Sequence, residues 1–336
     1  MSLAKQGTRQ ELTALAQRKD LSPKLALLLA REIPDQMRIK LAENTFAPSE
    51  SLVFLARDAH VRVRECIAKN PSTPIATRMQ LAADPHPKVR EAIARNPATP
   101  ADLLDQLAGD ENDFVPRAVA QNPQTPPETL ARLAQRRYEV YLLEILAARH
   151  DLSDAIQAYL AGFWNDKVRA SLAANATISQ TVLARLAEDP SDTVREMVAA
   201  NPVTPSDLLA LLVDDPSYAV REAVAANLAT SPDLLVRLAH GDHDGASRAA
   251  CLNHHAPVEL LVEFAQGDSR QRLLVARHPR TPVETIMQLA QDTDLDVRIA
   301  IARREDNPLE ILSIWAADAK LAARLLYNFN PYISRT

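Results

Sequence analysis

Apolar residues recur along the chain with the spacing of short amphipathic helices. Leu103, Leu104 and Leu107 fall on one face of a helix, and Val89 and Ile93 do the same in the segment before them. A turn, often Asp-Pro, separates the two patterns within a unit. The chain is therefore predicted to consist of two-helix units. Their first helix has about two to three turns, and their second helix is short, with an α or a 3-10 geometry left open.

A five-residue motif indicates that these units repeat. Asn-Pro-x-Thr-Pro begins at Asn70, Asn96, Asn122 and Asn201, and degenerate forms begin at Asn44, Asn175, Asn227, Asn253 and His278. The spacing is 26 residues throughout two runs, 44–122 and 175–253. Units of this kind stack so that each contacts only its neighbours. We therefore expect an all-α fold, an α-α superhelix (solenoid) of about a dozen 26-residue two-helix repeats.

The repeats are expected to form one solenoid domain over residues 1–336. It would comprise N-terminal capping units (1–43), repeats (44–304) with an irregular unit near 136–165, and a C-terminal cap (305–336). Thr8 with Glu11 is expected to open the first helix, and Asn330-Pro331 to end the last recognisable unit.

Prolines stand at the expected helix starts. In the Asn-Pro-x-Thr-Pro units, the second proline follows a threonine that can cap the helix, because threonine is a good N-cap and proline is favoured at the first helical position. An acid three residues later resembles a capping box in the pairs Thr99/Asp102, Thr125/Glu128, Thr204/Asp207 and Thr281/Glu284. The prolines therefore mark helix starts and do not interrupt helices.

Three polar positions recur in each unit. An aspartate stands twelve residues before the asparagine, at Asp58, Asp84, Asp110, Asp189 and Asp215, and by register at Asp292 and Asp318. An arginine stands six residues before it, at Arg38, Arg64, Arg90, Arg169, Arg195, Arg221, Arg272, Arg298 and Arg324. One hypothesis is an arginine stripe that binds anions. The other, which the recurring acid favours, is a structural Asp–Arg ladder that closes the turn and ties each unit to the next. The asparagine is expected to bond local backbone at a helix end.

The pattern Val-Arg-x-x-Val/Ala-x-Asn-Pro-x-Thr-Pro-x-x-Leu-Leu-x-x-Leu-Ala-x-Asp resembles the leucine-rich repeat variant family and is similar to HEAT-like repeats. The resemblance covers roughly residues 20–330. It implies a right-handed superhelix that alternates an α-helix with a short second helix, often 3-10. Some family members hold an iron–sulfur cluster in a cysteine-rich N-terminal segment. This chain has no cysteine before Cys66, and it has no His-Glu pair of the kind that iron-binding HEAT-like enzymes use, so neither property is expected here.

The sequence offers little catalytic chemistry. It has no H-E-x-x-H motif, no G-x-S-x-G motif and only six glycines, which disfavours a phosphate-cradling loop. We expect no catalytic residues, no cofactor and no enzymatic activity. No apolar run reaches the ~18 residues of a membrane span, and two distant cysteines fit a reducing compartment. The chain is expected to be cytoplasmic, with no membrane partner.

One cluster resembles a zinc site. His240, His243 and Asp244 precede Cys251, His254 and His255. The first group falls before a second helix and the other histidines follow it, so about 12 Å of helix separates them. Cys251 falls at a core position. We therefore predict no metal site.

The regular pattern fails between Asn122 and Asn175. The arginine position holds Pro116 and then Leu143, and the interval is one residue longer than two repeats. Five of the 14 aromatic residues lie here: Tyr138, Tyr141, Tyr159, Phe163 and Trp164. They either fill a packing gap or form a binding surface. At the start of successive second helices, outside the apolar face, the chain presents Arg62, Lys88, Phe114, Tyr141 and Lys167, so two aromatic residues lie between bases.

Two binding functions follow from this middle region. The first is a protein-interaction scaffold that holds a peptide or protein in its concave groove. Tyr138, Tyr141 and Trp164 would be anchors beside Phe114, and Arg136, Arg137 and Lys167 would steer an acidic partner. The second is nucleic-acid binding, with bases stacked on the aromatic rings. The stretch 151–250, with 7 basic and 14 acidic residues, disfavours it. A hydrolase or glycosylase with a site in the groove is a third hypothesis, without an identifiable substrate.

Overall fold

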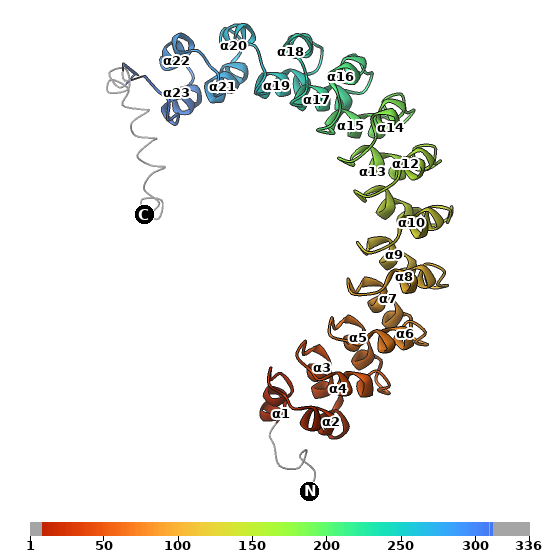
Figure 1. Ribbon diagram of the computed structural model, residues 1–336. Coiled ribbons are helices and arrows are strands. Elements are labelled where there is room, and N and C mark those ends of the chain that lie inside the picture. The colour runs from red at the N-terminus through yellow and green to blue at the C-terminus, as the bar shows by residue number, and fades with distance from the viewer. Residues whose placement is uncertain (1–8, 309, 312–336) are drawn as a thin grey trace. The chain divides into compact units, whose positions relative to one another are not determined.

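The chain is an all-α solenoid. The computed structural model describes residues 9–308 and 310–311, and within them it contains 23 α-helices and no strand (Figure 1). Contacts divide the chain into two compact units, Met1–Val168 and Arg169–Thr336. The predicted features at Thr8, Asp318, Arg324 and Asn330-Pro331 lie outside the described residues.

The first unit contains twelve helices before the one that reaches its end. They are α1 (Arg9–Ala16), α2 (Pro23–Glu32), α3 (Asp35–Glu43), α4 (Ser49–Leu55), α5 (Val61–Lys69), α6 (Ile75–Leu81), α7 (Pro87–Arg95), α8 (Ala101–Leu107), α9 (Phe114–Gln121), α10 (Pro127–Ala134), α11 (Val140–Ala147) and α12 (Asp154–Ala161). The boundary between the units falls within α13 (Asp166–Ala173).

The second unit continues the same alternation of first and second helices. Its helices are α14 (Gln180–Leu186), α15 (Asp192–Ala200), α16 (Ser206–Leu212), α17 (Tyr218–Ala226), α18 (Pro232–Ala239), α19 (Asp244–Leu252), α20 (Val258–Phe264), α21 (Ser269–Arg277), α22 (Val283–Leu289) and α23 (Leu295–Ala302). In each unit the second helices of successive repeats pack side by side, as α5, α7 and α9 do (Figure 1). Aliphatic side chains such as Ile93, Leu104 and Leu107 fill the core between the two rows.

The structure decides the geometry of the second helix, which the sequence left open. Among the described residues it is α-helical and not 3-10, and at eight or nine residues it is about as long as the first helix or longer. Alanine and arginine, which are strong helix formers, are its commonest residues. It ends at the predicted residue, since Asn96 is the C-cap of α7.

The threonines do not cap the helices that follow them, which corrects the prediction. Pro100 takes the N-cap position of α8 with an extended backbone, and this moves Thr99 outside the helix. The Thr99 hydroxyl donates instead to the Ile93 carbonyl at 2.6 Å, at the end of the preceding helix. Asp102 accepts from the backbone N–H of Leu103, so no capping box forms here. The threonine therefore closes the loop after the second helix.

The asparagines connect neighbouring repeats as well as bonding local backbone. The Asn96 side-chain amide donates to the carbonyl oxygens of Ala68, at 2.8 Å, and Asn70, at 3.4 Å, both in the repeat before. Its side-chain oxygen accepts from the N–H of Ala98 at 3.0 Å. Because Asn96 is only 3% exposed, water cannot replace these bonds.

Arginine replaces asparagine where the motif fails. Arg149 donates to the carbonyl oxygens of Ala120 and Asn122 at 2.6 and 2.9 Å, and its guanidinium also pairs with Asp151. Arg304 contacts the carbonyls of Ala276 and His278 in the same way. At Arg149 the longer side chain spans a repeat that is one residue longer, and at Arg304 it spans a repeat of ordinary length, so the backbone connection continues at both places.

Histidine takes the asparagine position at His278. Its Nε2 lies 3.2 Å from the Asn253 carbonyl oxygen, and its Nδ1 accepts from the N–H of Arg280. Burial lowers the pKa of His278, and the nearby His254, Arg280 and Arg304 lower it further, although the bond to Asn253 opposes them. The buried ring is therefore neutral at pH 7.

This burial predicts a stability loss in mild acid. The unfolded chain takes up a proton at His278 near pH 6.5, whereas the folded chain does so only at lower pH. Stability contributed by this group should therefore fall as the pH drops below about 6.5. His278→Asn should lose less thermal stability than wild type between pH 7.5 and 5.5. The exposed His255→Asn is the control, and an identical pH response in all three proteins would contradict the assignment.

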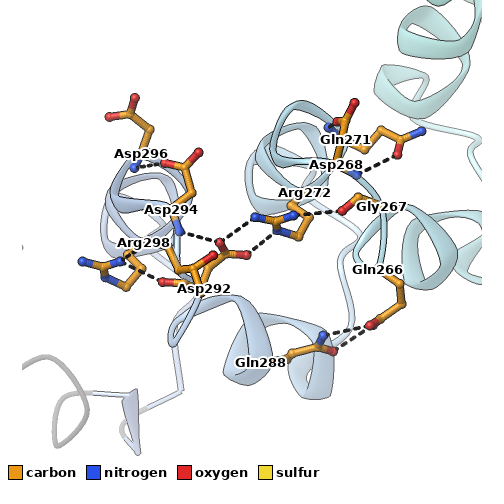
Figure 2. Close-up of polar contacts among 11 residues, drawn as sticks. Gln266, Gly267, Asp268, Gln271, Arg272, Gln288, Asp292, Asp294, Asp296 and Arg298 are labelled. Carbon is orange, nitrogen blue, oxygen red and sulfur yellow. Dashed lines mark hydrogen bonds and ion pairs between the residues drawn. The ribbon is translucent and has the colours of Figure 1, made fainter.

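The arginines and aspartates form a ladder between repeats. In Figure 2, Arg272 donates from Nε and Nη2 to the Asp292 carboxylate at 2.6 and 3.0 Å, and from Nη1 to the Gly267 carbonyl. Arg298, in the same repeat as Asp292, donates to the Asp292 backbone carbonyl at 2.7 Å. The carboxylate partner is therefore the aspartate of the next repeat, 20 residues on, and the six-residue offset joins arginine to backbone.

The same arginine–aspartate pair, called here a rung of the ladder, recurs in both units. Equivalent paired contacts of 2.6 Å occur at Arg38–Asp58, Arg64–Asp84, Arg90–Asp110, Arg169–Asp189 and Arg195–Asp215. Burial raises the pKa of Asp110, but the hydrogen bonds from Arg90 and from the Asn112 N–H outweigh it and leave the pKa below its ordinary value. The paired, ionised form is therefore the stable one at neutral pH.

Candidate binding surface at the interruption of the ladder

Two successive rungs of the ladder are replaced in the first unit. Pro116 and Arg136 occupy the positions of the first rung, and Leu143 and Phe163 those of the second. Leu143 and Phe163 are buried, so two apolar core side chains replace the ion pair at this rung.

Arg136 compensates for part of the loss. Its Nη2 donates at 3.0 Å to the Asp110 carbonyl, which corresponds to the Asp84 carbonyl that accepts from Arg90. Its Nη1 lies 3.2 Å from the Glu139 carboxylate. Burial raises the pKa of Glu139, although the charge of Arg136 opposes the shift. Arg136, which the sequence suggested for steering, is therefore half-buried and engaged in internal contacts.

Large aromatic side chains are exposed around this interruption. Phe114 and Tyr141 are 58% and 59% exposed, Trp164 is 70% exposed, and Tyr138 is almost completely exposed. Tyr138 lies in the turn before α11, and Trp164 lies in the turn before α13, where its ring packs on Phe163 at 5.5 Å.

Two of the predicted residues, Phe114 and Tyr141, both contact the same side chain, that of Arg117. The Arg117 guanidinium lies 5.6 Å from the centre of the Phe114 ring and 5.1 Å from that of Tyr141. Both distances fit a cation–π contact. Arg117 was not among the sequence candidates. The sequence does distinguish Arg117, because the equivalent positions in neighbouring repeats hold glutamate instead of arginine: Glu65, Glu91 and Glu144.

The remaining candidates lie at the edges of this surface. Arg137 is exposed beside Tyr138, and Lys167 is exposed at the start of α13, one repeat further along the chain. We call Phe114, Arg117, Tyr138, Tyr141 and Trp164 the aromatic–arginine surface.

A second aromatic group, in the second unit, was missed by the sequence analysis. The Tyr218 ring stacks on His243 with centroids 4.5 Å apart, and the Arg221 guanidinium lies 4.7 Å from the Tyr218 centroid. Arg221 pairs with Asp242 at 2.7 Å, on a carboxylate that is 75% exposed. The charges of this group are already paired, so it offers less to a ligand than the aromatic–arginine surface.

The histidine cluster does not converge. His240 contacts Glu263 at 2.7 Å, whereas the His243 ring nitrogen accepts from the N–H of Ala246 at the start of α19. Burial raises the pKa of the Cys251 thiol to about 12, which keeps it protonated. Over the described part of the chain, no group of three or more His, Cys, Asp or Glu side chains could hold a metal ion.

Within the same residues, no helix is both long enough and apolar enough to cross a membrane.

A family model agrees with the repeat pattern. The family model described as leucine rich repeat variant matches residues 87–112 and 192–217. A comparison with curated proteins gave no match. A solved leucine-rich repeat variant with a novel repetitive structural motif is 23% identical, with a TM-score of 0.46, over 74% of this chain and 87% of that one. Kap121p, solved bound to RanGTP, is 11% identical with a TM-score of 0.40, over 89% of this chain and 45% of its own length.

The two matched segments contain the polar positions described above. Residues 87–112 include Arg90, Asn96 and Asp110, and residues 192–217 include their counterparts Arg195, Asn201 and Asp215. The chain therefore carries leucine rich repeat variant repeats, and the resemblance found in its sequence is confirmed for this family.

Proposed function

We propose that this chain is a non-catalytic scaffold that binds a protein or peptide along the row of second helices, in the groove expected on its concave side. The binding site is centred on Phe114 and Tyr141, with Tyr138 and Trp164 as further anchors. The observation that supports it most is the coincidence of two features: four large exposed aromatic residues, Phe114, Tyr138, Tyr141 and Trp164, lie around the two replaced rungs of the first unit.

The energetics favour a binding role for these side chains. Tyrosine and tryptophan contribute most often to interface hot spots, because they bury a large area at a small cost in side-chain entropy. A packing repair would bury the aromatic residues, as Phe163 is buried at 6% exposure. Tyr138, Tyr141 and Trp164 instead remain open to solvent. A partner helix or extended peptide laid along a helix row can cover such anchors.

A pull-down from lysate of the source organism tests the proposal. Wild type is compared with a Tyr141→Ala/Trp164→Ala double variant, each with and without nuclease. The control is Ile75→Ala/Leu228→Ala, which removes two equally exposed apolar side chains elsewhere. We expect a protein that survives nuclease treatment and is retained by wild type and control, but is reduced about tenfold or more by the double variant.

Other results would point elsewhere. A partner that nuclease removes would favour nucleic-acid binding through stacked bases. Equal retention by all three proteins would contradict the location of the site.

A further inference from the structure

A single charge reversal distinguishes the aromatic–arginine surface from its neighbours. The outward position that Arg117 occupies in α9 holds Glu65 in α5 and Glu91 in α7. Those glutamates are paired within their own helices, Glu65 with Lys69 at 2.5 Å and Glu91 with Arg95 at 2.9 Å. Arg117 has no equivalent short pair.

The contacts of Arg117 fix its side chain and leave its hydrogen-bonding capacity largely unused. Its nearest paired carboxylate, Asp113, lies 3.9 Å away and is 58% exposed. The Arg117 Nε is buried without a hydrogen-bond partner among the described residues. The rings of Phe114 and Tyr141 contact the guanidinium within 5.6 Å, so its rotamers are restricted before any partner arrives. An arginine held in this way loses little entropy when it binds a planar anion through its N–H fork.

The acidic residues around Arg117 favour the binding of a small anion over that of a polyanion. Asp113 immediately precedes α9, Glu139 immediately precedes α11, and Glu144 lies on α11. They would repel a continuous row of phosphates, and nucleic-acid binding needs many cations to neutralise such a row. A single carboxylate meets one guanidinium with less repulsion. The rings beside it supply apolar area for the residue next to that carboxylate.

Resting on the proposed function, we infer that Arg117 determines partner specificity by binding an aspartate or glutamate side chain of the partner, while an adjacent apolar side chain packs on Tyr141 and Phe114. This assigns the recognition of an acidic partner to Arg117. Arg136 is excluded from that role because it is engaged by the Asp110 carbonyl and by Glu139.

Selection from a phage library of random linear peptides tests the inference. The peptides are fused at their C-terminal ends, so the carboxylates they offer are those of side chains. The proteins are wild type, Arg117→Glu, Tyr141→Ala and, as a charge-matched control on the same row, the exposed Arg62→Glu. Wild type and control should enrich peptides with an acid next to an apolar residue. Arg117→Glu should retain those peptides at about one tenth of the wild-type level or lower, as expected for the loss of a close charge pair. It should enrich basic peptides instead.

Several outcomes would overturn the inference. If enriched peptides show no acidic preference and bind Arg117→Glu equally well, yet depend on Tyr141, the role of Arg117 is wrong and the scaffold proposal stands. If no enriched peptide depends on Tyr141, both fail. Should Arg117→Glu not fold, as judged by its thermal melt, Arg117→Gln replaces it. The same loss of acidic peptides is then expected without the gain of basic ones, and unchanged enrichment contradicts the inference.

Discussion

Arg90→Ala should lower the free energy of unfolding by about 3 kcal/mol, at the lower end of the values found when one partner of a buried pair is removed. Arg90 donates to both oxygens of the Asp110 carboxylate, at 2.6 and 2.9 Å, and to the Asp84 carbonyl at 2.8 Å. The Asp110 side chain is only 8% exposed. Its charge would stay partly buried without a counter-ion, and the connection between the two repeats would be lost.

Urea unfolding followed by circular dichroism measures this effect. The matched control is Arg95→Ala on the same helix, whose side chain is 49% exposed and pairs with Glu91 at the surface. An exposed pair contributes about 0.5 kcal/mol. Similar small losses for both variants would contradict a structural role for the ladder. A much larger loss for Arg90→Ala would support it and would disfavour an arginine stripe held open for anions.

Asn96→Ala should destabilise the chain by a similar amount, about 3 kcal/mol. The change removes two donated hydrogen bonds and one accepted one, so the Ala68 carbonyl and the Ala98 N–H lose this partner, and the Asn70 carbonyl keeps its bond from the Thr73 N–H. Buried polar groups left unpaired cost about 1–3 kcal/mol each, and partial relaxation reduces the sum.

The chain itself suggests the rescue variant for this position. Because His278 fills the asparagine position in another repeat, Asn96→His should recover part of the lost stability at neutral pH. Asn112→Ala is the control, since Asn112 accepts only a local bond from the N–H of Phe114 at 3.2 Å and should cost below about 1 kcal/mol. Equal effects of Asn96→Ala and Asn112→Ala, measured by thermal melts, would contradict the proposed connection between repeats.

The repeat architecture was predictable because local and long-range signals agree. The 26-residue period, the two apolar faces and the asparagine at the helix end all lie in the sequence. The bonding partners were not predictable in the same way. Asp84 lies six residues before Arg90, and Asp110 lies 20 residues after it, one repeat further on. Because both aspartates recur with the same period, the repeat pattern alone cannot tell which of them is the carboxylate partner of Arg90.

One local feature was predicted wrongly and another was not recognised, both for physical reasons. Thr-Pro fits a helix start whether threonine is the cap or the residue before it, and only the backbone of Pro100 decides between them. The asparagine of the motif is missing near residue 149, yet Arg149 makes the equivalent backbone bonds with a longer side chain. A sequence pattern depends on residue types, whereas the fold requires only a hydrogen-bond donor to the backbone carbonyls of the preceding repeat.

The candidate surface was partly predictable. The exposure of Phe114 and Tyr141 follows from their places outside the apolar faces, whereas Trp164 lies in the turn before α13. Arg117 was missed because it follows Pro116, where the arginine position had already failed, and because its significance appears only when outward positions are compared between repeats. Its contact with two rings depends on how α9 and α11 pack, which the sequence does not give.

Hydrogen exchange of the protein saturated with its captured partner tests the central claim most directly. If the aromatic–arginine surface is the binding site, mass spectrometry should find new protection in peptides that cover 110–121 and 136–148. The Tyr218–His243 region should exchange as it does in the free protein. Protection confined to the second unit, or to the first-helix row, would contradict the account.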